Sequence, residues 1–228
     1  KHIPAAVRQL IACAAARLPL GLPGRNRLLM ASREPVQRLA SHGSFFDESA
    51  RRCLLRPAFQ RGFCLPGTAE EERAGLWSRS DSLLRKAMRC DFLSYLPDDV
   101  LVKVDRASML ASLEVRAPWL DYRIVEFAFR KVPDHLKATS HEAKILPKRL
   151  ARRMLPKDVD FNRKQGFSLP LADWLAGVWG DFVSEVLSEM EPEIFDQRMV
   201  QQLLRRQHRG YSHTARLFCL TMFELWRR

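Results

Sequence analysis

Ionisable side chains are concentrated in an otherwise apolar segment, residues 96–109, which reads LPDDVLVKVDRASM. On an α-helix its valines and leucine would form one stripe, while Asp98, Asp105 and Arg106 would lie near one another on a second face. A helix with this much apolar surface is expected to be buried. Buried charges are costly unless they are paired, so the group is either an internal ion network or part of a ligand site.

The next segment, residues 112–121, places two opposite charges close together. Glu114 and Arg116 alternate with apolar residues, so both side chains can project to one side of the chain. Pro118 disfavours a helical conformation in the residue before it and therefore bends the backbone. Asp121 is expected to cap the helix that follows. The charge pair is interpreted either as a salt bridge that fixes this corner or as part of a site wall.

Two lysines farther along the chain could bind an anion. Lys164 belongs to a predicted loop that contains Gly166, and a glycine lets the backbone approach a ligand closely. Lys144 stands at the predicted start of a basic helix that runs to Lys157. From the pattern alone, each lysine is more simply explained as a solvated surface charge.

Helical periodicity dominates the elements that must position these residues. Apolar side chains recur at spacings of three and four, and no run alternates as a β-strand would. Pro97, with acids beside it, is expected to begin a new helix, because the missing N–H of a proline costs nothing in a first turn. The chain is therefore predicted to be all-α. Helices are predicted over about residues 4–18, 34–41, 47–61, 69–78, 81–95, 97–113, 143–154, 170–176, 178–190, 197–208 and 213–227, with another after Pro118.

Composition is that of an ordinary globular chain of 228 residues, 46% hydrophobic and 28% charged. No apolar run approaches the ~18 residues of a membrane span. The five cysteines, irregularly spaced, predict neither a zinc site nor a disulfide framework, and reduced thiols favour a cytoplasmic location. The net charge of +12 would attract polyanions, but the arginines are spread over all predicted helices, as is typical of a solvated surface. Because the first residue is Lys1 and not Met, we expect a piece of a longer polypeptide.

Several ordered motifs resemble those of one enzyme family. LPDDVLVKVDRASM followed by SLEVRAPWLD is similar to the LPDDLLVKVDRASM and SLEVRVPFLD signatures of glutamine-hydrolysing asparagine synthetases. Residues 141–150, HEAKILPKRL, resemble the family's GEGKYLLRRAL segment, and residues 161–170, FNRKQGFSLP, resemble its RPKQGFGVP loop. The closing RLFCLTMFELW resembles the last helix with its Glu-x-Trp. The resemblance covers nearly the whole chain and is strongest from about residue 90 to 175.

The resemblance implies both a fold and an activity. The chain would be the helical C-terminal part of an α/β synthetase domain of the adenine-nucleotide α-hydrolase-like (PP-loop ATPase) kind. Residues 1–80 would form a variable helical region and 81–228 the C-terminal helical part, together one domain with upstream residues. Such enzymes use MgATP to convert the side-chain carboxylate of aspartate to β-aspartyl-AMP and pyrophosphate. Ammonia released from glutamine in a separate N-terminal domain then displaces AMP and gives asparagine.

The resemblance also implies roles for particular residues. Lys144 and Lys164 match the family's pyrophosphate-facing lysines, and Lys164 would be catalytic because fixed positive charge stabilises the departing pyrophosphate. Asp105 would be a second catalytic residue, which orients the substrate amine or a lysine or supports proton transfer from ammonia. Glu114 and Arg116 would bind substrate or brace the site wall. No metal ligand is assigned, since ATP and Mg²⁺ would be bound mainly by residues outside this chain.

Departures and absences limit what this piece is expected to do. The loop has Asn162-Arg163-Lys164 where the family has Arg-Pro-Lys, and so lacks a stiffening proline. Pro147 replaces a leucine and is tolerable only if its helix begins near Lys144, because proline clashes with the carbonyl four residues earlier. The SGGxDS pyrophosphate loop, the GEGxDE segment and the catalytic N-terminal Cys are missing. The isolated chain is therefore expected neither to bind ATP nor to make asparagine.

Two other functions remain open. One is a sister amide-forming enzyme: a lasso-peptide or β-lactam type cyclase, or an amidotransferase of a polysaccharide gene cluster. The other is a basic nucleic-acid-binding helical module, which is disfavoured because the basic region 137–160 lacks interleaved stacking aromatics. The expected partners are aspartate, ATP, ammonia and the upstream domains of the same polypeptide, without a membrane; a homodimer is left open.

Overall fold

The structure is a computed structural model that describes residues 3–62, 68–78, 81–161 and 169–228. Within these ranges the regular structure is helical, and β-type pairing is limited to two isolated bridges. This confirms the all-α prediction for the described residues. None of the helices described is both long and apolar enough to span a bilayer.

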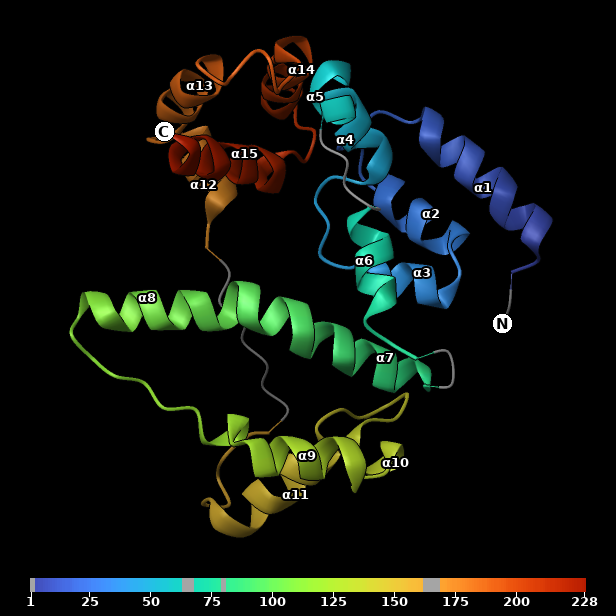
Figure 1. The fold of residues 1–228 in the computed structure, drawn as a ribbon, viewed down its shortest axis with the longest axis vertical. Helices are drawn as coiled ribbons and strands as arrows, with labels where there is room; N and C mark the ends of the chain where they lie inside the picture. Colours follow the sequence, from blue (N-terminus) through green and yellow to red (C-terminus); the bar gives the residue numbers. More distant parts are fainter. Residues whose placement is uncertain (1–2, 63–67, 79–80, 162–168) are drawn as a thin grey trace. The chain divides into compact units, whose positions relative to one another are not determined.

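The chain divides into two compact units, both visible in Figure 1. Unit 1 combines Lys1–Glu71 with Ser168–Arg228, and unit 2 is Glu72–Phe167. This division follows contacts in space. The boundary at residue 80, which the family resemblance implies, stays a prediction.

Unit 1 consists of helices from both ends of the chain. They are α1 (Ala5–Arg17), α2 (Arg25–Ser32), α3 (Pro35–Ala40), α4 (Glu48–Leu54), α5 (Pro57–Gly62), α12 (Leu171–Ala176), α13 (Gly180–Ser188), α14 (Gln197–His208) and α15 (Thr214–Arg227), while α6 (Ala69–Gly75) crosses the boundary of the unit. Most of these helices lie where the sequence predicts them. The exception is α2, which begins after Gly24 in the left-handed conformation and packs against α1.

The two chain segments of unit 1 share a hydrophobic core. Its fully buried members include Leu187 of α13, Leu203 of α14 and Leu217 of α15, and Leu54 of α4 joins them from the other segment. Burying a leucine side chain contributes roughly 1.5–3 kcal/mol. The backbone adds a direct link, because the N–H of Asp196 donates to the carbonyl of Leu54 at 2.7 Å. Neither segment therefore completes the core of unit 1 alone.

Unit 2 is organised around one long helix. Its parts are α7 (Leu83–Cys90), a π-helical stretch (Asp91–Leu101) and α8 (Val102–Leu110). Pro97 lies inside the π-helical stretch, so the prediction that it begins a new helix is wrong. In an α-helix a proline clashes with the carbonyl four residues earlier. The i→i+5 pattern of a π-helix shifts that carbonyl, and this shift lets the helix continue through the proline.

The rest of unit 2 contacts this helix at a few points. It comprises a 3₁₀ turn (Pro118–Leu120), α9 (Tyr122–Arg130), α10 (Asp134–Lys137) and α11 (Ile145–Met154). Phe92 and Phe129 meet edge to face with ring centroids 5.5 Å apart, and Ser82 Oγ donates to Asp134 at 2.6 Å. Asp121 caps α9 by accepting from the N–H of Arg123 at 2.9 Å, which confirms the predicted cap.

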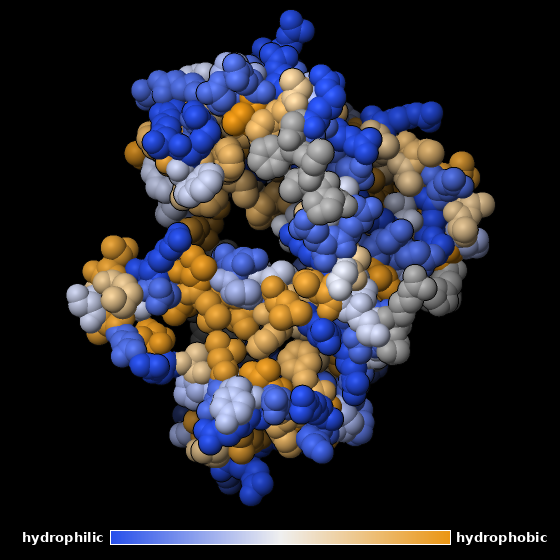
Figure 2. Space-filling view, in the orientation of Figure 1, coloured by the Kyte–Doolittle hydropathy of each residue, from blue (hydrophilic) through white to orange (hydrophobic). Residues whose placement is uncertain are grey.

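The long helix exposes much apolar surface, although the sequence predicts that it is buried. Leu110 is 91% exposed, and Val104 and Tyr95 are 40% and 58% exposed. Figure 2 shows exposed hydrophobic side chains clustered on unit 2. The prediction of a buried helix with buried charges is therefore wrong for the described residues. An apolar stripe indicates that one face of a helix is covered by other protein, but it does not identify the segment that covers it.

Candidate active site

The residues that the sequence singles out all belong to unit 2. Asp105 lies on α8, Glu114 and Arg116 lie on the segment after it, and Lys144 precedes α11. All four are exposed. No hydrogen bond or ion pair described in the structure joins Asp105 or Lys144 to the other three. Lys164 lies outside the described residues, so its role stays a prediction.

The carboxylate of Asp105 is available to a ligand. It projects from the first turn of α8 and forms no ion pair with any residue that the structure describes. The nearby Lys103 pairs instead with Asp99, at 3.6 Å. The hydroxyl of Ser108 donates to the backbone carbonyl of Asp105 at 3.0 Å and not to its carboxylate. The predicted cluster of Asp98, Asp105 and Arg106 is thus not an ion network here.

Glu114 and Arg116 form the expected ion pair. Their side chains are 71% and 83% exposed, and an exposed pair of this kind contributes little to stability. The role of this pair in bracing a site wall stays a prediction.

A tight turn of backbone presents Lys144. Residues 138–143 fold back on themselves, with an isolated bridge between Ala138 and Ala143. The N–H of Thr139 donates to the carbonyl of Glu142 at 2.7 Å, and the hydroxyl of Thr139 accepts from the N–H of Glu142 at 3.1 Å. The chain then enters α11 through Lys144, which occupies the N-cap position.

Lys144 is held in an unusual conformation. Its φ of 59° and ψ of 39° lie in the left-handed region, which costs a residue with a side chain roughly 1–2 kcal/mol. Strain of this kind is concentrated at functional sites. A glycine would adopt the conformation freely, so the presence of a lysine here is notable. Sequence periodicity carries no signal for this feature.

The charges around Lys144 also distinguish it from its basic neighbours. Glu142 lies 3.6 Å from the ammonium of Lys148 and 3.9 Å from the guanidinium of Arg152. Lys144 has no such partner within the described part of the chain. A cation on a fixed turn without a local counter-ion is suited to bind an anionic group from outside.

Helix α11 begins late enough in the sequence to accommodate Pro147. The helix begins at Ile145, so Pro147 is its third residue. The first four N–H groups of a helix have no intrahelical acceptor, and a proline there removes no hydrogen bond. The expectation that this helix begins near Lys144 is confirmed.

A second strained residue, Ser112, sets the exit of the chain from α8. Its φ is 55°, and the N–H of Leu113 donates to the carbonyl of Ser108 at 2.9 Å while that of Ser112 donates to Met109 at 3.0 Å. These two bonds form a Schellman motif, whose left-handed position is usually occupied by glycine. The motif directs the segment that carries Glu114.

Replacing Ser112 with glycine is therefore expected to raise the free energy of unfolding by about 1 kcal/mol, since the left-handed cost disappears. Denaturant unfolding of the two proteins measures the difference. Ala107→Gly, in the interior of α8, is the matched control and should lower stability by about 1 kcal/mol. A loss of stability in Ser112→Gly would contradict the assigned strain.

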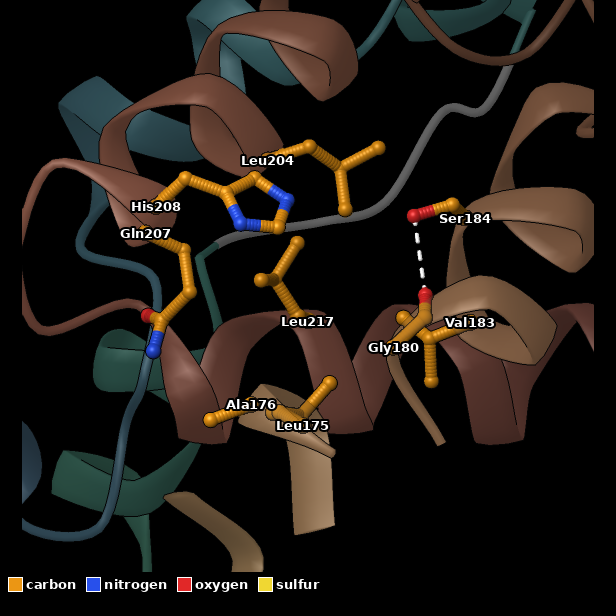
Figure 3. A pocket seen from close by; sticks show the side chains of 9 residues that line it. All are labelled: Leu175, Ala176, Gly180, Val183, Ser184, Leu204, Gln207, His208 and Leu217. Atoms are coloured by element: carbon orange, nitrogen blue, oxygen red, sulfur yellow. Dashed lines mark hydrogen bonds between the residues drawn. The ribbon is translucent and has the colours of Figure 1, made fainter. Parts of the chain in front are cut away.

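A separate hollow of about 200 Å³ lies in unit 1 between α12, α13, α14 and α15 (Figure 3). Its lining is mostly apolar. The hydroxyl of Ser184 is already donated to the carbonyl of Gly180 at 2.9 Å, and the amide of Gln207 bonds Thr214. None of the predicted site residues lines this hollow, and His208 is the one basic side chain among its described lining residues.

The described residues fit only part of the expected ligand. Lys144 suits a phosphate. No group of three or more His, Cys, Asp or Glu side chains is placed to hold a metal ion in the ranges that the structure describes.

Comparison with known proteins identifies the family. The asparagine synthase family model matches residues 14–228. The chain is 26% identical over 232 residues to the glutamine-hydrolyzing asparagine synthetase 1 of Bacillus subtilis (strain 168), which covers 99% of this chain and 35% of the relative. It is 27% identical over 230 residues to a putative glutamine-hydrolyzing asparagine synthetase of Mycobacterium bovis, with 99% and 34% coverage. No solved structure matches significantly.

This helical chain is matched by that family model over nearly its whole length. It belongs to the asparagine synthase family. The chain spans about a third of the length of the curated relatives it matches.

Proposed function

We propose that this chain supplies the pyrophosphate-facing helical wall of a glutamine-dependent asparagine synthetase. The complete enzyme would adenylate the side-chain carboxylate of aspartate with ATP and transfer glutamine-derived ammonia to it, which gives asparagine, AMP and pyrophosphate. The observation that carries the proposal is Lys144, a cation without a described acidic partner, held by a left-handed turn at the position that matches a family phosphate lysine. Family membership supports the reaction class.

Each site residue has a definite task in this proposal. Lys144 and Lys164 place positive charge beside the departing pyrophosphate, where negative charge develops. Asp105 orients the attacking nitrogen or a lysine and can accept a proton from it. Glu114 and Arg116 keep the corner after α8 in place as an ion pair. When bound, Mg²⁺ would neutralise phosphate charge, and its ligands would lie mainly outside this chain.

The remaining two thirds of the relatives' length leaves room for the other parts of such an enzyme. We assign ATP binding and glutamine hydrolysis to residues outside this chain, and a cytoplasmic location to the whole. The exposed apolar side of α8 supports this arrangement, because large apolar patches are usually covered by a partner surface. Val102 and Leu110, with 38% and 91% exposure, would be buried against the upstream part of the synthetase domain. The isolated 228 residues would then be inactive.

Replacing Lys144 with alanine in the complete protein is expected to slow aspartate-dependent ATP–pyrophosphate exchange about 10-fold or more, the effect of losing one charge-assisted contact. Glutamine hydrolysis should be unchanged. Lys164→Ala should give the same pattern. Lys148→Ala is the control, because Lys148 is already paired with Glu142. Parallel assays of exchange and glutaminase activity measure both effects.

Lys144→Gly separates the charge of this residue from its backbone strain. The glycine relieves the left-handed conformation and should make the protein more stable, yet exchange should stay as low as in the alanine variant. Equal loss of exchange and glutamine hydrolysis in either variant would mean that Lys144 is structural. Exchange driven by a carboxylate other than aspartate would instead indicate a sister amide-forming enzyme.

A further inference from the structure

A cluster of buried and half-buried arginines in unit 1 contains more positive than negative charge. Arg25 and Arg216 are 3% and 6% exposed, and Arg33 and Arg51 lie in the same region. The acids that face them are Asp47 and Glu70. Four guanidinium groups thus meet two carboxylates, and buried charges are costly when they are not balanced.

Each of the two carboxylates already has an arginine partner. Asp47 accepts from Arg25 at 3.2 Å, from the hydroxyl of Ser49 at 2.5 Å and from the N–H of Ala50 at 2.9 Å. Glu70 accepts from both terminal nitrogens of Arg51, at 3.1 and 2.5 Å. No described hydrogen bond or ion pair joins Arg33 or Arg216 to either carboxylate, although the charge of Arg33 acts on Glu70 and that of Asp47 acts on Arg216.

Burial raises the pKa of Asp47, but the bonds from Ser49 and Ala50 and the charge of Arg25 outweigh it and leave this pKa below its ordinary value. The pKa of Glu70 is likewise lowered, because its bonds from Arg51 outweigh its burial.

Arg33 and Arg216 are left with donors that point to no acceptor. The Nη1 atom of Arg33 and the Nε atom of Arg216 are buried and have no hydrogen-bond partner among the residues that the structure describes. Arg216 uses its Nη1 on the carbonyl of Ser212 at 3.2 Å, and its guanidinium carbon lies 5.9 Å from the centre of the Phe46 ring. Buried donors of this kind need an explanation in a folded protein.

Both arginines line one small cavity of about 50 Å³, which Ser41, Asp47 and Glu70 also border. This is room for a group of a few heavy atoms and not for a nucleotide. From this geometry we infer that the cavity is a binding site for a small oxyanion, a phosphate, sulfate or carboxylate group, held by Arg33 and Arg216. Planar guanidinium groups match the oxygens of such anions with two parallel donors, so the chemistry of the lining favours an oxyanion over a halide.

Titration calorimetry of the full-length protein with inorganic phosphate, at constant ionic strength maintained with chloride, tests the inference. Saturable binding is expected, with sulfate and acetate as competing anions that rank the preferred group. Arg33→Gln should weaken phosphate binding about 10-fold or more, because it removes a charge-assisted bond. Arg27→Gln removes the same charge from the exposed side of α2 and should bind phosphate as the wild type does.

The same titration in Lys144→Ala distinguishes this cavity from the proposed pyrophosphate site. The binding event that Arg33→Gln weakens should persist in Lys144→Ala with the same affinity. Arg33 is only partly buried, so Arg33→Gln should fold even if Arg216→Gln does not. Three results would overturn the inference: no saturable binding of phosphate, sulfate or acetate to the wild type, equal binding by Arg33→Gln, or loss of binding in Lys144→Ala instead.

Discussion

Gly21→Ala is expected to lower the free energy of unfolding by roughly 2–5 kcal/mol, the sum of a left-handed backbone cost and overpacking of a buried site. Gly21 has a φ of +82°, and a Cβ added there would lie 2.6 Å from Cε1 and 2.7 Å from Nε2 of His213. The imidazole cannot move aside easily, because His213 is 1% exposed. The carbonyl of Gly21 also accepts from the N–H of Ser212 at 3.0 Å, so the backbone is fixed as well.

Gly24 offers a matched control a few residues away. Its φ is +89°, but a Cβ there would meet nothing within 4 Å. Gly24→Ala should therefore cost only the backbone term, about 1–2 kcal/mol. Denaturant unfolding of both variants measures the difference between them, which isolates the collision with His213. If both variants lose the same free energy of unfolding, the close approach of Gly21 to His213 does not contribute to the loss.

Acidification from about pH 6.5 to pH 4 is expected to destabilise the protein through His213. Burial is the main reason that the pKa of this imidazole falls to about 4, and the charges of Arg216 and Arg206 lower it further. In the unfolded chain His213 has its ordinary pKa of 6.5, whereas in the folded protein its pKa is about 4. As the pH falls, the imidazole is therefore protonated in the unfolded chain first. The unfolded state binds more protons in this window, so stability falls as the pH falls, by roughly 3 kcal/mol for this group alone.

Replacing His213 with leucine should flatten this part of the pH profile. The exposed His208 provides the control, and His208→Gln should keep the wild-type slope. Unfolding free energies measured by denaturant at intervals between pH 4 and 7 supply the comparison. Asp47, a half-buried carboxylate, has a pKa below the ordinary value and loses its contribution at lower pH, outside most of this window. An unchanged slope in His213→Leu would mean that His213 already carries a proton in the folded protein.

The helices of this chain were largely predictable, because most rest on local signals. Helix α14 is predicted over 197–208 and found over Gln197–His208, with Asp196 as its N-cap and Gly210 after its end. Helix α2 has only a weak amphipathic pattern, and packing against α1 stabilises it instead. Pro97 misled the prediction because a π-helical stretch depends on tertiary context that no local pattern records.

Less of the candidate site could be predicted. Motif resemblance located Lys144 and Asp105, and residue spacing gave the Glu114–Arg116 pair. The left-handed backbone of Lys144 could not be foreseen, since a lysine is an improbable choice for that conformation. The exposure of α8 was also missed, because an apolar stripe indicates burial without naming the covering surface.

The discontinuity of unit 1 has a consequence for how the protein is made. Residues 1–71 cannot complete their core until the segment after residue 168 leaves the ribosome, because Leu54 packs with side chains of α13, α14 and α15. All of unit 2 is translated in between, which at ~5–20 residues per second takes on the order of ten seconds. During that interval the nascent N-terminal helices carry uncovered apolar surface. They are the natural targets for chaperones, and translation stalled within unit 2 would leave them open to proteases.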